Sequence, residues 1–140
     1  MPSVFSRIIA GELPGRFVWQ DERCVAFLSI APLKPGHTLV VPREEVGQWL
    51  DLETGLARHL MVVSQSIGKA LDKAYSPERV GMMIAGLEVP HVHLHVVPID
   101  DVHDLDFERA NQNAQPAELD AAAARVRAAL RDLGYPEVSD

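Results

Sequence analysis

The sequence predicts an α+β fold, with a mostly antiparallel sheet of about five strands, one long helix and a C-terminal helix. Two observations carry this prediction. Several short runs rich in valine, leucine and isoleucine are bounded by turn residues, which is typical of strands. One longer stretch instead repeats its apolar residues every three or four positions, which is typical of a helix. At 140 residues the chain is long enough for one hydrophobic core, so we expect a single domain over residues 1–140.

Three helices are expected from their end signals and their periodicity. Ser3 is placed to cap a short helix through Ile9, which the turn region at 11–15 ends. The long helix is expected over residues 52–75, where apolar residues recur at spacings of three and four. Pro116 is suited to the first turn of the last helix, and Gly134 and Pro136 then close it.

Five strands are expected, and the first three form an antiparallel meander. They cover residues 17–20, 24–30, 37–42, 79–86 and 91–98. Between the last strand and the C-terminal helix, residues 99–115 carry several aspartates without a clear period, so this segment is expected to be a surface loop. Met61, Met82 and Met83 are expected to fill the core, because methionine adapts its shape to irregular gaps.

Composition excludes several classes of function. Thirteen Lys and Arg residues against twenty Asp and Glu residues give a net charge of −7 with no basic run, which argues against a nucleic-acid partner. No apolar stretch approaches the roughly 20 residues that a membrane helix needs, and no signal peptide is recognisable. Because the lone Cys24 cannot form an internal disulfide, the expected location is cytoplasmic.

The segment HVHLHVVP at 91–98 places three histidines at every second position. In a strand, His91, His93 and His95 share one face, while the apolar residues between them share the core face. Two adjacent imidazoles of such a row could bind one metal ion, and an extended phosphate ester could be contacted by several of them. A solvent-exposed row without chemistry is the third possibility, and the spacing alone leaves all three open.

Four blocks of the sequence extend this pattern to a family resemblance. HVHLHVV at 91–97 resembles the signature of the histidine triad superfamily, in which three histidines alternate with apolar residues. IIAGELP at 8–14, CVAFLSI at 24–30 and KPGHTLVVP at 34–42 resemble the other blocks of that family, in the same order. The resemblance is to the branch of bacterial histidine triad nucleotide-binding proteins. It covers about residues 3–98 and leaves the loop and helix at 99–140 unaccounted for.

The resemblance implies an enzyme of the nucleotidyl hydrolase or transferase type, of the kind that acts on nucleoside phosphoramidates or dinucleoside polyphosphates. It would act as a homodimer, without a cofactor, on a purine nucleotide such as an AMP derivative. His93 is then the nucleophile at the α-phosphorus, His95 contacts the phosphate and leaving group, and His91 and His37 support the row. His93 must present an unprotonated nitrogen, so a backbone carbonyl is expected to hold the proton on its other ring nitrogen.

The same resemblance implies a set of substrate-binding residues. The apolar slot for the purine is assigned to Phe5, Ile8, Phe27 and Ile30. Ser29 is assigned to the ribose, and the backbone N–H groups of Glu88 and Val89 are assigned to the phosphate. Two other functions remain as alternatives. One is a nucleotide-binding protein with little or no turnover, and the other is a metal protein that uses adjacent histidines of the row.

The chain departs from the family pattern in three places. Ser3 and Ser6 stand where many relatives have a Cys-x-x-Cys pair that joins histidines to hold zinc; hydroxyls are poor zinc ligands, so we expect no metal. Ser29 stands where an aspartate usually binds the ribose, which weakens the expectation of ribose recognition. The 80–90 segment is shorter than in relatives and has Leu87 where glutamine is common, which favours a different leaving group or a more open site.

Overall fold

A computed structural model describes all residues from Met1 to Asp140. In chain order the elements are α1 (Val4–Ile9), β1 (Phe17–Gln20), β2 (Cys24–Leu28), β3 (Thr38–Pro42), the 3₁₀ turn η1 (Trp49–Asp51), α2 (Thr54–Tyr75), β4 (Arg79–Met83), β5 (Leu94–Ile99), the 3₁₀ turns η2 (Val102–Leu105) and η3 (Phe107–Arg109), and α3 (Pro116–Asp132). The strands form one antiparallel sheet in the order β1-β2-β3-β5-β4. The predicted α+β fold and the meander of the first three strands are confirmed.

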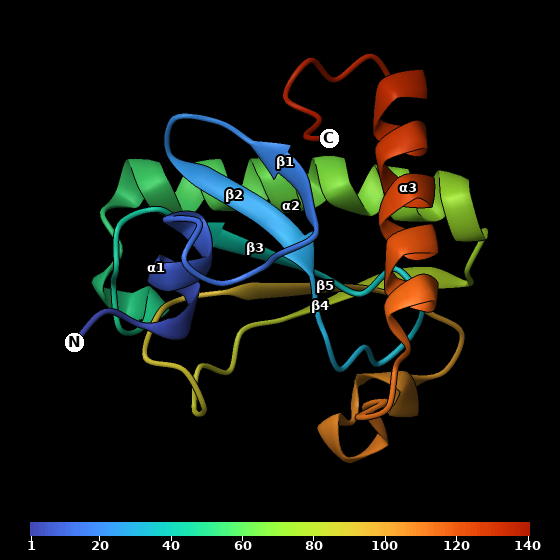
Figure 1. The fold of residues 1–140 in the computed structure, drawn as a ribbon, viewed down its shortest axis with the longest axis horizontal. Helices are drawn as coiled ribbons and strands as arrows, with labels where there is room; N and C mark the ends of the chain where they lie inside the picture. The colour runs from blue at the N-terminus through green and yellow to red at the C-terminus, as the bar shows by residue number, and fades with distance from the viewer.

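The larger core lies between the sheet and its two long helices. In Figure 1, α2 runs behind the sheet and α3 crosses one end of it. Alternate sheet residues such as Val40, Leu94 and Val96 pack here against Leu60 and Ile67 of α2. As predicted, the apolar residues between the triad histidines therefore face the core.

A smaller core lies on the opposite face of the sheet, where α1 is placed (Figure 1). Phe5 of α1 packs there against Phe27 of β2 and Leu39 of β3. Because side chains alternate along a strand, His95 of β5 emerges on this second face, beside Leu39 of β3. The short helix α1 and the sheet thus form the walls between which the histidine row lies.

The helix ends follow their sequence signals closely. The Ser3 hydroxyl accepts the backbone N–H of Ser6 as the N-cap of α1, and Pro116 occupies the first turn of α3. α2 begins at Thr54, two residues later than expected, because the Glu53 carboxylate caps it by accepting the N–H groups of Gly55 and Leu56.

The last two strands differ from the prediction in a way that affects the site. β5 begins only at Leu94, so His91 and His93 precede the strand and His95 alone belongs to it. The reason is that the backbone N–H groups before the strand bond elsewhere: that of His91 to the Val89 carbonyl, and that of Val92 to Val46. All three histidines are nevertheless buried, and His95 lies inside the sheet between β3 and β4, not at an exposed edge.

Three further expectations need correction or refinement. Met61 and Met82 do not fill the core, because their side chains are 54% and 39% exposed on α2 and β4. The expected strand at 24–30 ends at Leu28, so that Ser29 and Ile30 lie in the loop that follows. The segment at 99–115 is not wholly irregular, since it forms η2 and η3, which begin after capping aspartates. No helix combines the length and apolar character required to cross a bilayer.

Candidate active site

A cavity of about 370 Å³ opens between α1, the sheet and the segment before β5. All seven residues assigned to substrate binding line it: Phe5, Ile8, Phe27, Ser29, Ile30, Glu88 and Val89. His93 and His95 reach the same cavity, whereas His91 and His37 lie behind them. The structure therefore brings together residues that the sequence places up to 90 positions apart.

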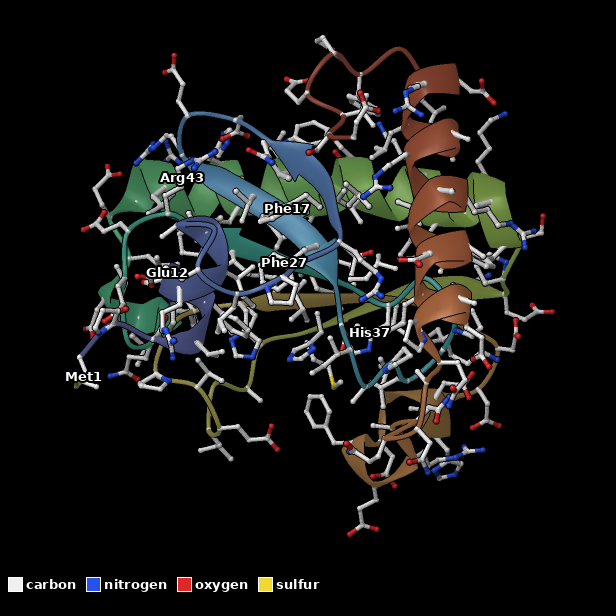
Figure 2. The ribbon with its side chains drawn as sticks, in the orientation of Figure 1. Met1, Glu12, Phe17, Phe27, His37 and Arg43 are labelled. Carbon is white, nitrogen blue, oxygen red and sulfur yellow. The ribbon has the colours of Figure 1, made fainter.

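The cavity has an aromatic and aliphatic wall. Strand register aligns Phe27 of β2, Leu39 of β3 and His95 of β5 as a row across one face of the sheet. The Phe5 ring lies 5.6 Å from the Phe27 ring and 4.8 Å from the His93 ring, between centroids. Figure 2 shows Phe17 and Phe27 together in front of the sheet, with His37 beside the lower end of α3. Such a wall suits a flat apolar ring.

The hydrogen bond of His93 determines which of its ring nitrogens is free. Nδ1 lies 2.8 Å from the backbone carbonyl of His91, and a carbonyl can only accept, so Nδ1 carries the proton. In the neutral ring Nε2 then has a free lone pair. Burial lowers the pKa of His93, which keeps the ring neutral near pH 7. The backbone carbonyl that the sequence predicts beside His93 is therefore that of His91, a member of the histidine row itself.

His37 and His95 form a second, ordered pair. The Leu33 backbone N–H donates to His37 Nδ1 at 3.0 Å, so the His37 proton is on Nε2 and donates to His95 Nδ1 at 2.9 Å. His95 must therefore carry its own proton on Nε2, as a donor available to the cavity. Burial lowers the pKa of His37 to about 3 and that of His95 to about 4, so both rings are neutral near pH 7.

His91 is fully buried and held at both ring nitrogens. Nε2 lies 2.8 Å from the Pro42 carbonyl and must donate to it, so Nδ1 is the acceptor for the Ser3 hydroxyl at 2.6 Å. The row thus contains one imidazole with a free lone pair, His93, next to one with a free N–H, His95. Their ring centroids are 4.9 Å apart, so both can reach one tetrahedral anion.

Several residues of the site carry no sequence signal that would have identified them. Gln112 and Leu119 come from the C-terminal third and line the main cavity, together with Arg16, its one arginine or lysine. Phe107 of η3 stands edge-on to His95 at 5.0 Å and lines a hollow of about 110 Å³ on the far side of the histidines. Gln112 and Phe107 belong to residues 99–115, which show no periodicity, so only the folded chain reveals that they reach the site.

His59 has a partner that the spacing of the sequence does not reveal. Its Nε2 lies 2.8 Å from the Asp21 carboxylate, which also accepts the Trp19 indole N–H and the backbone N–H groups of Arg23 and Cys24. Asp21 is therefore a saturated acceptor that ties the β1–β2 turn to α2. Burial raises the pKa of the Cys24 thiol far above its usual range, so this cysteine is an unreactive core residue.

Comparison with known proteins agrees with this geometry. The family model described as HIT domain matches residues 10–102. An uncharacterised HIT-like protein of Borreliella burgdorferi is 35% identical over 116 residues, which is 78% of this chain and 84% of that protein. A zinc-bound histidine triad family protein of Mycobacterium smegmatis superimposes with a TM-score of 0.80 at 27% identity, covering 93% of this chain and 94% of its own. A HIT family hydrolase of Legionella pneumophila matches with a TM-score of 0.59 at 26% identity, over 69% and 91%.

The residues of this chain do not fit a zinc ion beside His91. Ser3 and Ser6, at the positions where the family resemblance implies a Cys-x-x-Cys pair in many relatives, offer hydroxyls that already bond to His91 and Glu45. The 2.6 Å contact between Ser3 Oγ and His91 Nδ1 uses the lone pair that a metal would need. A hydroxyl is also a poor substitute for a thiolate in a tetrahedral zinc site. No step of the chemistry below involves a metal.

Proposed function

Because the chain belongs to the histidine triad family, we propose that it is a nucleotidyl hydrolase that cleaves a purine nucleoside 5′-phosphate derivative at its α-phosphorus. The observation that carries the proposal is the proton arrangement in the cavity. His93 presents a free Nε2 lone pair and His95 a free N–H, side by side at the end of an apolar slot. A nucleophile next to a hydrogen-bond donor is what attack on a phosphate requires.

The reaction proceeds in two displacements at phosphorus. His93 Nε2 attacks, the bond from phosphorus to the leaving group breaks, and the leaving atom takes up a proton from solvent, so that His93 becomes a nucleotidyl-imidazolium. Water then attacks phosphorus, the bond to Nε2 breaks, and the water gives one proton back to solvent as the nucleotide leaves and the neutral imidazole is restored. The His95 N–H donates to a phosphate oxygen or to the leaving atom. The backbone N–H groups of Glu88 and Val89 make no hydrogen bond within the chain, so they are available to the same phosphate.

The lining of the hollow beyond the histidines favours an amine as the leaving group. Phe107 and Leu87 line it with the Glu88 carboxylate, and no lysine or arginine does. An anionic leaving group such as a second nucleotide would be repelled by the Glu88 carboxylate, because no cationic side chain lines the hollow. A protonated amine would instead be attracted to the carboxylate and to the Phe107 ring. We therefore expect P–N substrates to be cleaved faster than P–O substrates.

A substrate panel tests this proposal directly. Release of AMP is measured from adenosine 5′-phosphoramidate, diadenosine polyphosphates and an aminoacyl adenylate. The expected order places the phosphoramidate first. If no substrate is turned over by a folded protein that still binds AMP, the chain is a nucleotide-binding protein, the alternative that Ser29 and the short 80–90 segment favour.

Ser29 gives a prediction about ribose recognition. Its hydroxyl lines the cavity and also accepts the backbone N–H of Ala31 at 3.2 Å, so it can meet a ribose only through this one oxygen and not with two oxygens as a carboxylate can. We expect the wild type to bind AMP and 2′-deoxy-AMP with nearly equal affinity. Ser29→Asp is expected to favour AMP by about tenfold, the typical value of one added hydrogen bond to a charged group.

Isothermal titration calorimetry with both nucleotides measures this ratio, with Ser29→Ala as the matched control. Equal affinities in Ser29→Asp would show that the ribose hydroxyls do not lie at this position.

We also propose that two chains pair through β4, which is the free edge of the sheet next to β5. Beside it, Met61, Val62, Met82 and Ile84 expose apolar surface, and a groove of about 720 Å³ runs between α2 and β4. The Ser64 hydroxyl in this groove is buried without a hydrogen-bond partner. An unpaired strand edge beside exposed apolar side chains is typical of an interface with a second copy.

This pairing predicts the effect of charge on assembly. Val62→Glu combined with Met82→Glu is expected to convert a dimer into a monomer, because four carboxylates would lie buried in the interface. Sedimentation equilibrium measures the mass. Leu50→Glu, which also replaces an exposed apolar residue but lies on η1, is the control and should remain dimeric. A dimeric double variant would contradict pairing through this face.

A further inference from the structure

Behind the triad, two segments of the chain meet beside the ring of His91. Ser3 and Ser6 come from the start of α1, and Glu45 comes from the loop after β3. The Glu45 carboxylate accepts the Ser3 backbone N–H at 2.6 Å and the Ser6 hydroxyl at 2.7 Å. Ser3 Oγ then lies 2.6 Å from His91 Nδ1. We call Ser3, Ser6 and Glu45 the serine–glutamate clamp.

The proton positions in the clamp follow from its acceptors. The Pro42 carbonyl requires a proton on His91 Nε2, so His91 Nδ1 accepts the proton of the Ser3 hydroxyl. Glu45 stays ionised, because the hydrogen bond from the Ser3 backbone and then that from the Ser6 side chain lower its pKa. Every polar atom between Glu45 and His91 thus has a defined role as donor or acceptor.

A single residue, His91, connects the clamp to the nucleophile His93. The His91 ring is fixed at both nitrogens, and the carbonyl of the same residue accepts the Nδ1 proton of His93. The loop that carries Glu45 holds this stretch a second time, because the Val46 carbonyl accepts the backbone N–H of Val92. The orientation of His91 therefore determines whether His93 keeps its free lone pair on Nε2.

We propose that the serine–glutamate clamp positions the nucleophile His93 by holding His91, and that Ser3 is its principal residue. This inference rests on the proposed function. It assigns a role in catalysis to residues that contact neither the cavity nor the substrate. The competing explanation is that Ser3 only caps α1 through its bond to the Ser6 N–H, and the experiment has to separate the two roles.

The kinetics of two Ser3 variants distinguish positioning of His91 from simple capping of α1. Ser3→Ala is expected to lower kcat by about tenfold, the typical effect of one lost buried hydrogen bond, with KM changed less than twofold. Ser3→Thr keeps the hydroxyl and is expected to restore kcat. A purely structural loosening of α1 would instead displace Phe5 and Ile8 from the wall of the cavity, and would raise KM.

Two further variants serve as controls. Glu53→Ala removes the N-cap of α2, so it is expected to lower Tm without changing kcat. Glu45→Ala changes an exposed side chain and is expected to lower kcat about threefold with the same KM. An unchanged kcat in both Ser3→Ala and Glu45→Ala would overturn the proposal, as would a loss in Glu53→Ala equal to that in Ser3→Ala.

A spectroscopic measurement keeps the test independent of turnover. In ¹⁵N-histidine-labelled wild type at pH 7, the His93 signals are expected to show a single tautomer, protonated at Nδ1. Ser3→Ala should show a mixture of both tautomers. If the wild type has no turnover but the tautomer changes as expected, the clamp stands and the proposed function fails. If the tautomer is the same in both proteins, the clamp fails.

Discussion

The His93→Gln variant is expected to bind AMP with nearly wild-type affinity while AMP release falls by at least about 10³-fold. Glutamine retains the size and polarity of the side chain but has no nitrogen lone pair that could attack phosphorus. The apolar slot around Phe5 and Phe27 is unchanged, so nucleotide binding should survive. A large loss of kcat with retained binding is therefore the signature of a lost nucleophile.

Two additional measurements complete this test. In the wild type, rapid quenching into alkali is expected to trap a histidine that carries one nucleotide, and peptide mass spectrometry should place it at His93. His103→Gln is the control, because His103 is exposed on η2 and lines neither the main cavity nor the hollow beside the histidines. Turnover by His93→Gln at the wild-type rate, or a nucleotide trapped at His95, would contradict the assignment.

The second large effect is a loss of stability in acid. The pKa of His37 is lowered to about 3 and that of His95 to about 4, whereas an unfolded histidine titrates near 6.5. Below pH 6.5 the unfolded chain therefore binds protons that the folded chain does not, and the free energy of unfolding decreases as the pH falls. The decrease continues down to the folded pKa values and is absent above about pH 7.

Between pH 7 and pH 5, His37 and His95 are each expected to lower the free energy of unfolding by about 2 kcal/mol. Urea denaturation at a series of pH values measures it. His37→Asn removes one of the contributing groups and should make the slope shallower, whereas His103→Asn should leave it unchanged because that histidine is exposed. A flat profile from pH 7 to pH 5 in the wild type would show that these imidazoles are not buried as neutral rings.

Most of the fold could be predicted from local sequence. Alternation in the strands, the Ser3 cap and Pro116 in the first turn of α3 are properties of neighbouring residues, so they were visible without the structure. The strand ends were less predictable. β5 starts after His93 because backbone groups of residues 91 and 92 bond to Val89 and to Val46, and the second of these contacts is not local.

The same division applies to the site. The triad pattern and the family resemblance identified many of the residues that line the cavity, though not Arg16, Gln112 or Leu119. The exposed positions of Met61 and Met82 contradicted a choice made on residue type alone. Methionine is compatible with both a core and an interface, and the sequence offers no local feature that separates the two.

The sequence by itself determined the element types, the apolar face of the last strand and the alternating row of histidines to which the proposed roles of nucleophile and donor are assigned. Only the tertiary structure decided how those histidines are protonated and what surrounds them. His37 contacts His95 across 58 positions, Ser3 contacts His91 across 88, and Phe107 closes over His95 from a segment without periodicity. Such contacts depend on strand register and on loop paths, which many distant residues determine together, and therefore no short stretch of sequence encodes them.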